Sequence, residues 1–223
     1  MKILSNPKSL KKYIDKHLLN THFTDFNINY FELHKFEKNE YICVAGQKLN
    51  YLYFLIEGSA NVFLTLKDGR QILISYLIPF HVIGDVELKR FGISRLDVVA
   101  SQECLAIALP FEIINSKLGK DFKFWQYAVE TISEKLESTT ETLIISSLYP
   151  FKIKFAHHLL NSTTKDDIVN FDSLTSLAVF LGVSYRQLLR VVHEFENDGI
   201  IKKHKSSFQI ENFDKLEILL VDF

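Results

Sequence analysis

The sequence predicts an α+β protein in which a roll of short strands, one long helix and a small helical domain follow one another. Short β-branched and aromatic runs separated by turn residues fill residues 30–110, which is typical of a jelly roll. Apolar residues then recur at spacings of four and three through 121–148, as in a long helix. Beyond Pro150, two short helical patterns precede a hairpin pattern. We therefore expect domains at 1–120, 121–149 and 150–223.

The composition favours a folded protein and argues against several functional classes. The 223 residues, 47% of them hydrophobic, can support real cores, while a formal charge of −1 gives no overall signature of nucleic-acid binding. The chain has neither a run of roughly 18 apolar residues nor a signal-type N-terminus, so we expect a cytoplasmic protein. It also has no metal-ligand spacing, nucleophile motif or phosphate-binding loop, so we expect no enzyme, no metal site and no cofactor.

The segments around the roll follow the same logic. Ser9–Leu19 has the pattern of a short amphipathic helix, and Thr21–Asn29 that of a loop. Asp68-Gly69 marks a tight hairpin turn between two strands. We expect Asp97–Leu109 to form one closing strand. Strands this short, with turns this close together, favour an antiparallel roll.

The long helical pattern carries a narrow apolar seam rather than a broad apolar face. Its members are Trp125, Val129, Ile132, Leu136, Thr139 and Leu143. A seam of this width is typical of a coiled coil, so these residues are the expected dimer interface. The alternative is a helix whose seam packs against its own domain.

The C-terminal helices meet at Gly182, which stops the first helix, and Ser184 begins the second. Ser184 and Gln187 have the spacing of a capping box, in which each side chain bonds the amide of the other residue. Arg186 and Arg190 lie one turn apart on the polar face, where a helix-turn-helix places its DNA donors. The expected DNA contacts are Ser184, Tyr185, Arg186, Gln187, Arg190, Lys202, Lys203 and Lys205. The alternative is an ordinary helical hairpin with a solvated basic face.

Gly182, Ser184 and Arg190 match a motif of the Crp/Fnr family of transcription regulators, which the chain resembles over nearly its whole length. The runs 182–189 and 83–88 resemble the YeiL-type subgroup of that family. The resemblance implies a cyclic-nucleotide-binding-like β-roll, a dimerisation helix and a winged helix-turn-helix whose wing is the C-terminal hairpin. It implies a homodimer that regulates transcription by reading a palindromic operator. The implied partners are double-stranded DNA and a second copy of the chain, and contact with RNA polymerase stays open.

The recognition helix departs from the family at two positions. The family often has arginine and glutamate directly after the serine, where this chain has Tyr185 and Arg186. Arg186 offers only donors, so its contact should move to guanine or to phosphate. Tyr185 has a ring that can touch a thymine methyl and a hydroxyl that can reach phosphate. We therefore expect an operator sequence unlike that of the glutamate-bearing members.

The resemblance also implies an effector pocket in the roll. Its candidate residues are Gly84, Asp85, Glu87, Arg95, Thr139 and Thr140. Gly84, Asp85 and Arg95 match the nucleotide-binding members, but Glu87 and Leu96 do not. A carboxylate at Glu87 would repel a cyclic phosphate and could pair with Arg95 instead. We therefore expect an effector other than cAMP, of unknown identity.

Other residues suggest weaker hypotheses. Cys43 and Cys104 lie in apolar runs and are expected to be buried small hydrophobes; the alternative is the redox pair suspected in YeiL-type relatives. The N-terminal cysteine cluster of the Fnr branch is missing.

Some relatives bind haem through the roll, but His81 is better explained as a hydrogen-bonded residue. The competing function is a small-molecule-binding or scaffold protein whose C-terminal helices contact protein rather than DNA.

Overall fold

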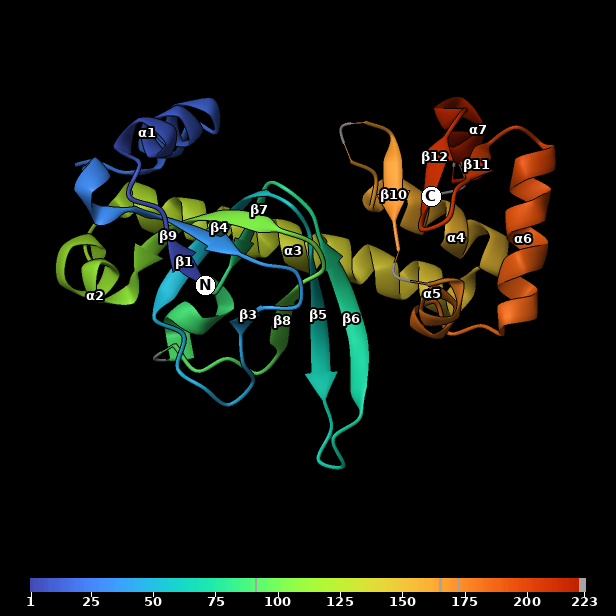
Figure 1. The fold of residues 1–223 in the computed structure, drawn as a ribbon, viewed down its shortest axis with the longest axis horizontal. Coiled ribbons are helices and arrows are strands. Elements are labelled where there is room, and N and C mark those ends of the chain that lie inside the picture. Colours follow the sequence, from blue (N-terminus) through green and yellow to red (C-terminus); the bar gives the residue numbers. More distant parts are fainter. Residues whose placement is uncertain (91, 165, 172, 221–223) are drawn as a thin grey trace. The chain divides into compact units, whose positions relative to one another are not determined.

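The computed structural model describes residues 1–90, 92–164, 166–171 and 173–220. These divide into two compact units, Met1–Leu136 and Glu137–Phe223, which are considered separately below. Helix α3 (Phe122–Leu148) continues from the first unit into the second (Figure 1). No helix within the described residues has the length and apolar character needed to cross a membrane.

The first unit is a roll of two antiparallel sheets (Figure 1). One sheet has the order β1 (Lys2–Ile3), β2 (Glu32–Phe36), β9 (Cys104–Pro110), β4 (Tyr51–Glu57), β7 (His81–Ile83). The other has the order β3 (Tyr41–Cys43), β8 (Asp97–Ala100), β5 (Ala60–Thr65), β6 (Gln71–Leu77). The strands β5 and β6 form the hairpin expected around Asp68-Gly69. The predicted jelly-roll architecture is therefore confirmed.

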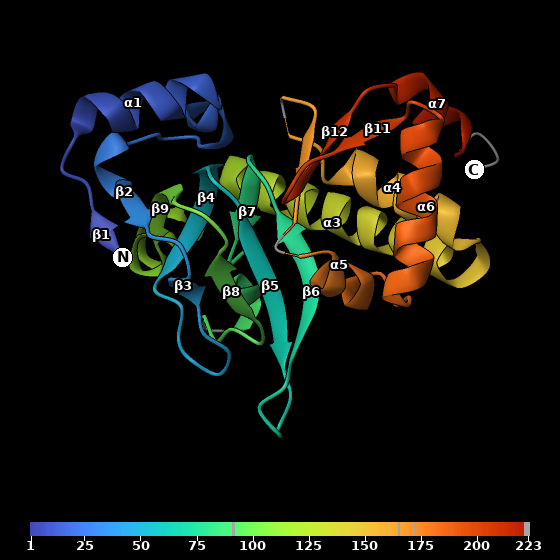
Figure 2. The ribbon, with the colours of Figure 1, turned by 45° about the vertical axis from the view of Figure 1, so that its right-hand side comes forward.

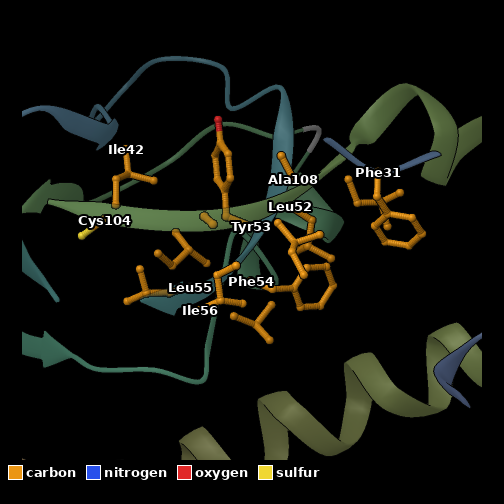
Figure 3. Packing of buried hydrophobic residues seen from close by; sticks show 14 of the residues in the cluster. Phe31, Ile42, Leu52, Tyr53, Phe54, Leu55, Ile56, Cys104 and Ala108 are labelled. Carbon is orange, nitrogen blue, oxygen red and sulfur yellow. The ribbon is translucent and has the colours of Figure 1, made fainter. Parts of the chain in front are cut away.

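In the core of the roll, strand β4 has buried side chains on both of its faces. Tyr53 and Phe54 leave β4 on opposite sides, and both are buried (Figure 3). Phe54 and Phe124, which lies at the start of α3, are both fully buried in the same core. Burial of apolar surface stabilises a fold by roughly 25 cal/mol for each Å² removed from water. The buried side chain of Phe124 therefore stabilises the packing of α3 on the roll.

The remaining elements of the first unit are short. They are α1 (Pro7–Lys16), η1 (Leu19–His22), η2 (Ile28–Tyr30), η3 (Val86–Arg90), α2 (Phe111–Ile113) and the π-helix η4 (Ile114–Leu118). The loop predicted at 21–29 thus includes parts of two 3₁₀ turns. The prediction of a single strand at Asp97–Leu109 is wrong, because the chain turns between β8 and β9, and these two strands belong to different sheets. Ser101 fixes that turn, since its Oγ donates to Ser59 O at 2.9 Å.

The second unit is a helical domain with a small sheet. Its elements are α4 (Phe151–Asn161), β10 (Ile168–Asn170), α5 (Leu174–Phe180), α6 (Tyr185–Asn197), β11 (Ile201–Lys203), β12 (Ser207–Ile210) and α7 (Phe213–Ile218). The sheet order is β10-β12-β11, so the expected C-terminal hairpin gains a third strand, β10. Phe155, Phe195 and Phe208 are fully buried and hold helices and sheet together.

Candidate functional site

The turn between α5 and α6 has the form that its sequence predicts. Gly182 has a φ of 67°, a backbone conformation that residues with a side chain rarely adopt. The Gly182 N–H donates to Val179 O at 3.1 Å, and the Val183 N–H donates to Ala178 O at 2.9 Å. This pair of bonds is a Schellman motif, which ends α5 and sets the direction in which α6 begins. In Figure 2, α5 lies at the start of α6 and the β11–β12 hairpin follows its other end.

The first turn of α6 is capped by one side chain. Ser184 Oγ accepts from the Gln187 N–H at 3.2 Å, as expected of an N-cap serine. The return bond from the Gln187 side chain to the Ser184 amide is not formed in the described part of the chain, so that half of the predicted capping box is wrong. One accepting hydroxyl suffices, because it already satisfies a helical donor that would otherwise lack a partner.

The two faces of α6 are clearly divided. Leu188, Val192 and Phe195 are fully buried in the core of the second unit. Arg186 and Arg190 lie on the exposed side, and neither makes a hydrogen bond or ion pair with any other described residue. A guanidinium group carries five donors in a fixed fork, so this face presents cationic donors that the fold itself does not use.

The β11–β12 hairpin, called the wing below, adds further cations. Lys202, Lys203 and Lys205 are exposed, and their ammonium groups have no hydrogen-bond or ion-pair partner among the described residues. The wing is tied to α6, because Glu196 Oε1 accepts from the Lys203 N–H at 3.1 Å. The recognition helix and the wing are therefore held together by a direct bond.

The candidate effector segment of the roll holds a buried ion pair. Asp85 is 4% exposed, and its Oδ2 accepts from Lys135 Nζ at 2.6 Å. Lys135 Nζ also donates to Val82 O at 2.6 Å, so α3 is bonded to β7 and to the turn after it. Gly84 has a φ of 98°, and a Cβ there would lie 2.7 Å from the Leu49 side chain. Only glycine fits this close turn, and the turn brings the carboxylate of Asp85 to the lysine.

Glu87 and Arg95 do not form the ion pair suggested by the sequence. Glu87 is half-buried, and burial raises the pKa of its carboxyl group. Its Oε1 accepts a long hydrogen bond from Ser94 Oγ, at 3.4 Å. Arg95 is exposed and makes no ion pair within the described residues. Thr139 and Thr140 belong to the second unit and are exposed on α3, so the roll itself unites Gly84, Asp85 and Glu87.

The seam of α3 is exposed along its whole length. Leu136 is 66% exposed and Val129 is 61% exposed, and Trp125, Ile132, Thr139 and Leu143 are exposed as well. The helix packs on the roll through a different face, which includes Phe124 and Ala128. An apolar seam of this length is unusual on a monomer surface and suggests that something covers it.

Both cysteines are buried free thiols, on β3 and β9. Burial raises the pKa of each thiol, that of Cys104 to about 11. Cys104 Sγ also donates to Ser59 O at 3.0 Å. Because the thiolate is the reactive form, these are the properties of packing residues.

Lys135 is the residue of this region that sequence reasoning missed. It stands on the polar side of the α3 pattern, 50 residues from its partner Asp85. A lysine on a solvated helix face carries no local signal of such a partner. Only the helical offset from the seam, one residue before Leu136, could have indicated that it faces the roll.

Comparisons with known proteins agree with this architecture. Residues 33–121 match the family model of the cyclic nucleotide-binding domain. The chain is 31% identical over 190 residues to the regulatory protein YeiL of Escherichia coli O157:H7, covering 85% of this chain and 86% of that protein. It is similar in structure to FixK2 from Bradyrhizobium japonicum, with a TM-score of 0.71, 17% identity and coverage of 84% and 96% of the two chains. It also resembles a CRP/FNR family transcriptional regulator from Thermus thermophilus, with a TM-score of 0.61, 18% identity and coverage of 84% and 97%.

Proposed function

Because the chain belongs to the Crp/Fnr family and is a DNA-binding transcription regulator of that type, we propose that it acts as a homodimer reading a palindromic operator. The observation that supports this most is the set of exposed cations on α6 and the wing that have no partner among the described residues. Cations that a fold leaves unpaired on one surface are available to phosphates and base edges.

Each part of the chain has a role in this proposal. Residues 1–120 form a sensor-type roll, 121–149 a dimerisation helix and 150–223 the DNA reader. Two copies would bury the exposed seam of α3 against each other and place two recognition helices on half-sites about one helical turn apart. The protein would work in the cytoplasm without catalysing a reaction, with RNA polymerase beside the operator as a further partner.

The roll would respond to an effector other than cAMP. Asp85 and Glu87 present carboxyl groups, and the cation beside them, Lys135, is already bonded to Asp85 and to Val82. A cyclic phosphate would be opposed by the carboxyl groups of Asp85 and Glu87, and the exposed Arg95 would be the one cation of the candidate set left to offset them.

Salt-dependent binding of duplex DNA tests the proposal. Affinity for a mixed-sequence duplex should fall about a thousandfold or more between roughly 50 and 200 mM salt, because bound phosphates release their counterions. Absent or salt-independent binding would instead favour a scaffold that contacts protein.

A variant pair tests the dimer in the same assay. Leu136→Glu should give a monomer in sedimentation and lose DNA affinity, since it would bury an unpaired charge in the seam. Ser138→Glu places the same charge on an exposed position of α3 outside the seam and should stay dimeric. A dimeric Leu136→Glu variant would contradict the assignment of the seam.

A further inference from the structure

A groove of about 670 Å³ lies in the second unit between the start of α5, the first residue of α6 and the tip of the wing. It is lined by Ser173, Leu174, Thr175, Tyr185, Glu196, Lys203, His204 and Lys205. We call it the wing groove. Three separate segments of the chain meet there, so its shape depends on the fold of the whole unit.

The wing groove is rich in donors that the protein does not use. Tyr185 is 47% exposed, and neither its hydroxyl nor that of Thr175 has a hydrogen-bond partner among the described residues. Lys203 and Lys205 add two ammonium groups that are likewise without internal partners there. Hydroxyl and ammonium groups are the side chains that commonly bind phosphate oxygens in protein–DNA complexes.

One carboxylate also lines the wing groove. Glu196 is half-buried, and its Oε1 accepts from the Lys203 N–H at 3.1 Å. It therefore fixes the position of the wing, while its charge opposes any anion that enters. Replacing Glu196 by glutamine would remove the charge and keep an oxygen that can accept from the Lys203 N–H.

We propose that the wing groove binds one DNA backbone phosphate in each half-site and that the hydroxyl of Tyr185 is one of its donors. Tyr185 is then a positioning residue rather than a reader of bases. Its neighbour Arg186 does not line the groove, and helix geometry places it about 100° further around α6. The two residues at which this chain departs from its family then have different roles. Arg186 contacts base edges, and Tyr185 binds a phosphate of the DNA backbone. The inference rests on the proposed function.

Tyr185→Phe tests the inference, because it keeps the ring and removes only the hydroxyl. Binding should weaken about ten- to a hundredfold for every duplex sequence, the effect of one lost hydrogen bond to a charged group. Selection of bound duplexes from a random pool should return the same base preference as wild type. A set of duplexes with a single uncharged methylphosphonate linkage should locate the phosphate, since one linkage should weaken wild type more than it weakens Tyr185→Phe, which keeps only the lysine contacts to that phosphate.

Glu196→Gln tests the groove from the opposite direction. The amide oxygen can still accept from the Lys203 N–H, but the negative charge is gone, so affinity should rise about two- to fivefold. Glu217→Gln, an exposed position on α7 outside the groove, should change affinity less.

The outcomes separate the inference from the function on which it rests. A changed base preference in Tyr185→Phe would make Tyr185 a base reader and overturn the inference. Unchanged affinity of that variant would overturn it too, as would equal effects of the two glutamine variants. Wild-type protein without salt-dependent DNA binding would overturn the proposed function itself.

Discussion

The effector segment of the roll and the reading face of the second unit treat their charges in opposite ways. In the roll, the buried carboxylate of Asp85 is neutralised by Lys135, and the same ammonium group also satisfies Val82 O. On α6, Arg186 and Arg190 are exposed and have no partner within the described residues. The fold thus uses one set of charges internally and leaves the other free.

The difference indicates which charges serve stability and which serve binding. A buried carboxylate without its cation would strain the folded state, whereas an exposed arginine contributes little to folding. Substitutions in the two regions should therefore separate cleanly, one affecting unfolding and the other affecting DNA.

Lys135→Met should have the largest effect. It leaves Asp85 buried without a cation, so the free energy of unfolding should fall by about 3 to 5 kcal/mol. Adding Asp85→Asn should recover much of the loss, because the uncompensated charge is removed. Denaturant unfolding of the wild type, the single variant and the double variant measures this. A single variant as stable as wild type would mean that the pair does not matter to the fold.

Arg186→Ala should do the reverse. Stability should stay within about 0.5 kcal/mol of wild type, since the side chain is exposed. DNA binding should weaken by about 1 to 3 kcal/mol, with relaxed preference at one position in each half-site. Lys203→Ala is the matched control, because it should weaken all sequences alike and flatten the salt dependence. Selection from a random pool distinguishes the two, and an unchanged preference in Arg186→Ala would show that it does not read bases.

Acid should destabilise both units, the first through the partly buried His81 and the second through the buried His158. Burial lowers the pKa of His81 and of His158 to about 4, and the charge of Lys135 adds to the effect on His81. Unfolded histidine takes up a proton near pH 6.5, whereas these folded ones stay neutral, so stability is lost as pH falls from about 6.5 towards 4. Between about pH 7.5 and 5.5 each should contribute a loss of about 1 to 2 kcal/mol. Urea unfolding at the two pH values should show a smaller loss for His81→Gln than for wild type, and equal losses would contradict the assignment.

The smallest expected effect is that of cAMP. Two carboxyl groups and an engaged lysine outweigh the single exposed Arg95 at this position, so micromolar cAMP should give no heat of binding in calorimetry. A Glu87→Ser variant removes one carboxyl group and shows whether that group alone prevents binding. Micromolar affinity of the wild type would contradict the comparison drawn between the two regions.

Local patterns predicted most of the fold correctly. The Asp68-Gly69 hairpin, the stop at Gly182 and the C-terminal hairpin each depend on a few neighbouring residues, and all three are present. The turn at 101–103 was missed because β8 and β9 are similar apolar runs, and only their pairing with different sheets separates them. Likewise β10 is three residues long and becomes a strand only because β12 pairs with it.

The local features of the candidate site could be predicted from the sequence, whereas its long-range features could not. The exposed face of α6 follows from helical spacing alone, so Arg186 and Arg190 could be placed from the sequence. The bond between Lys135 and Asp85 could not, because it joins residues 50 positions apart. The wing groove needs three segments folded together, and no single stretch of sequence contains it.

The bond from Glu196 to the wing has a consequence for the kinetics of operator binding. Because the Lys203 amide is already fastened to α6, helix and wing need little ordering when they reach DNA. A preorganised surface avoids much of the entropy loss of association, so encounter should be fast and similar for cognate and unrelated duplexes. Discrimination between operators would then lie in residence time, with the correct sequence released slowly and the wrong ones quickly.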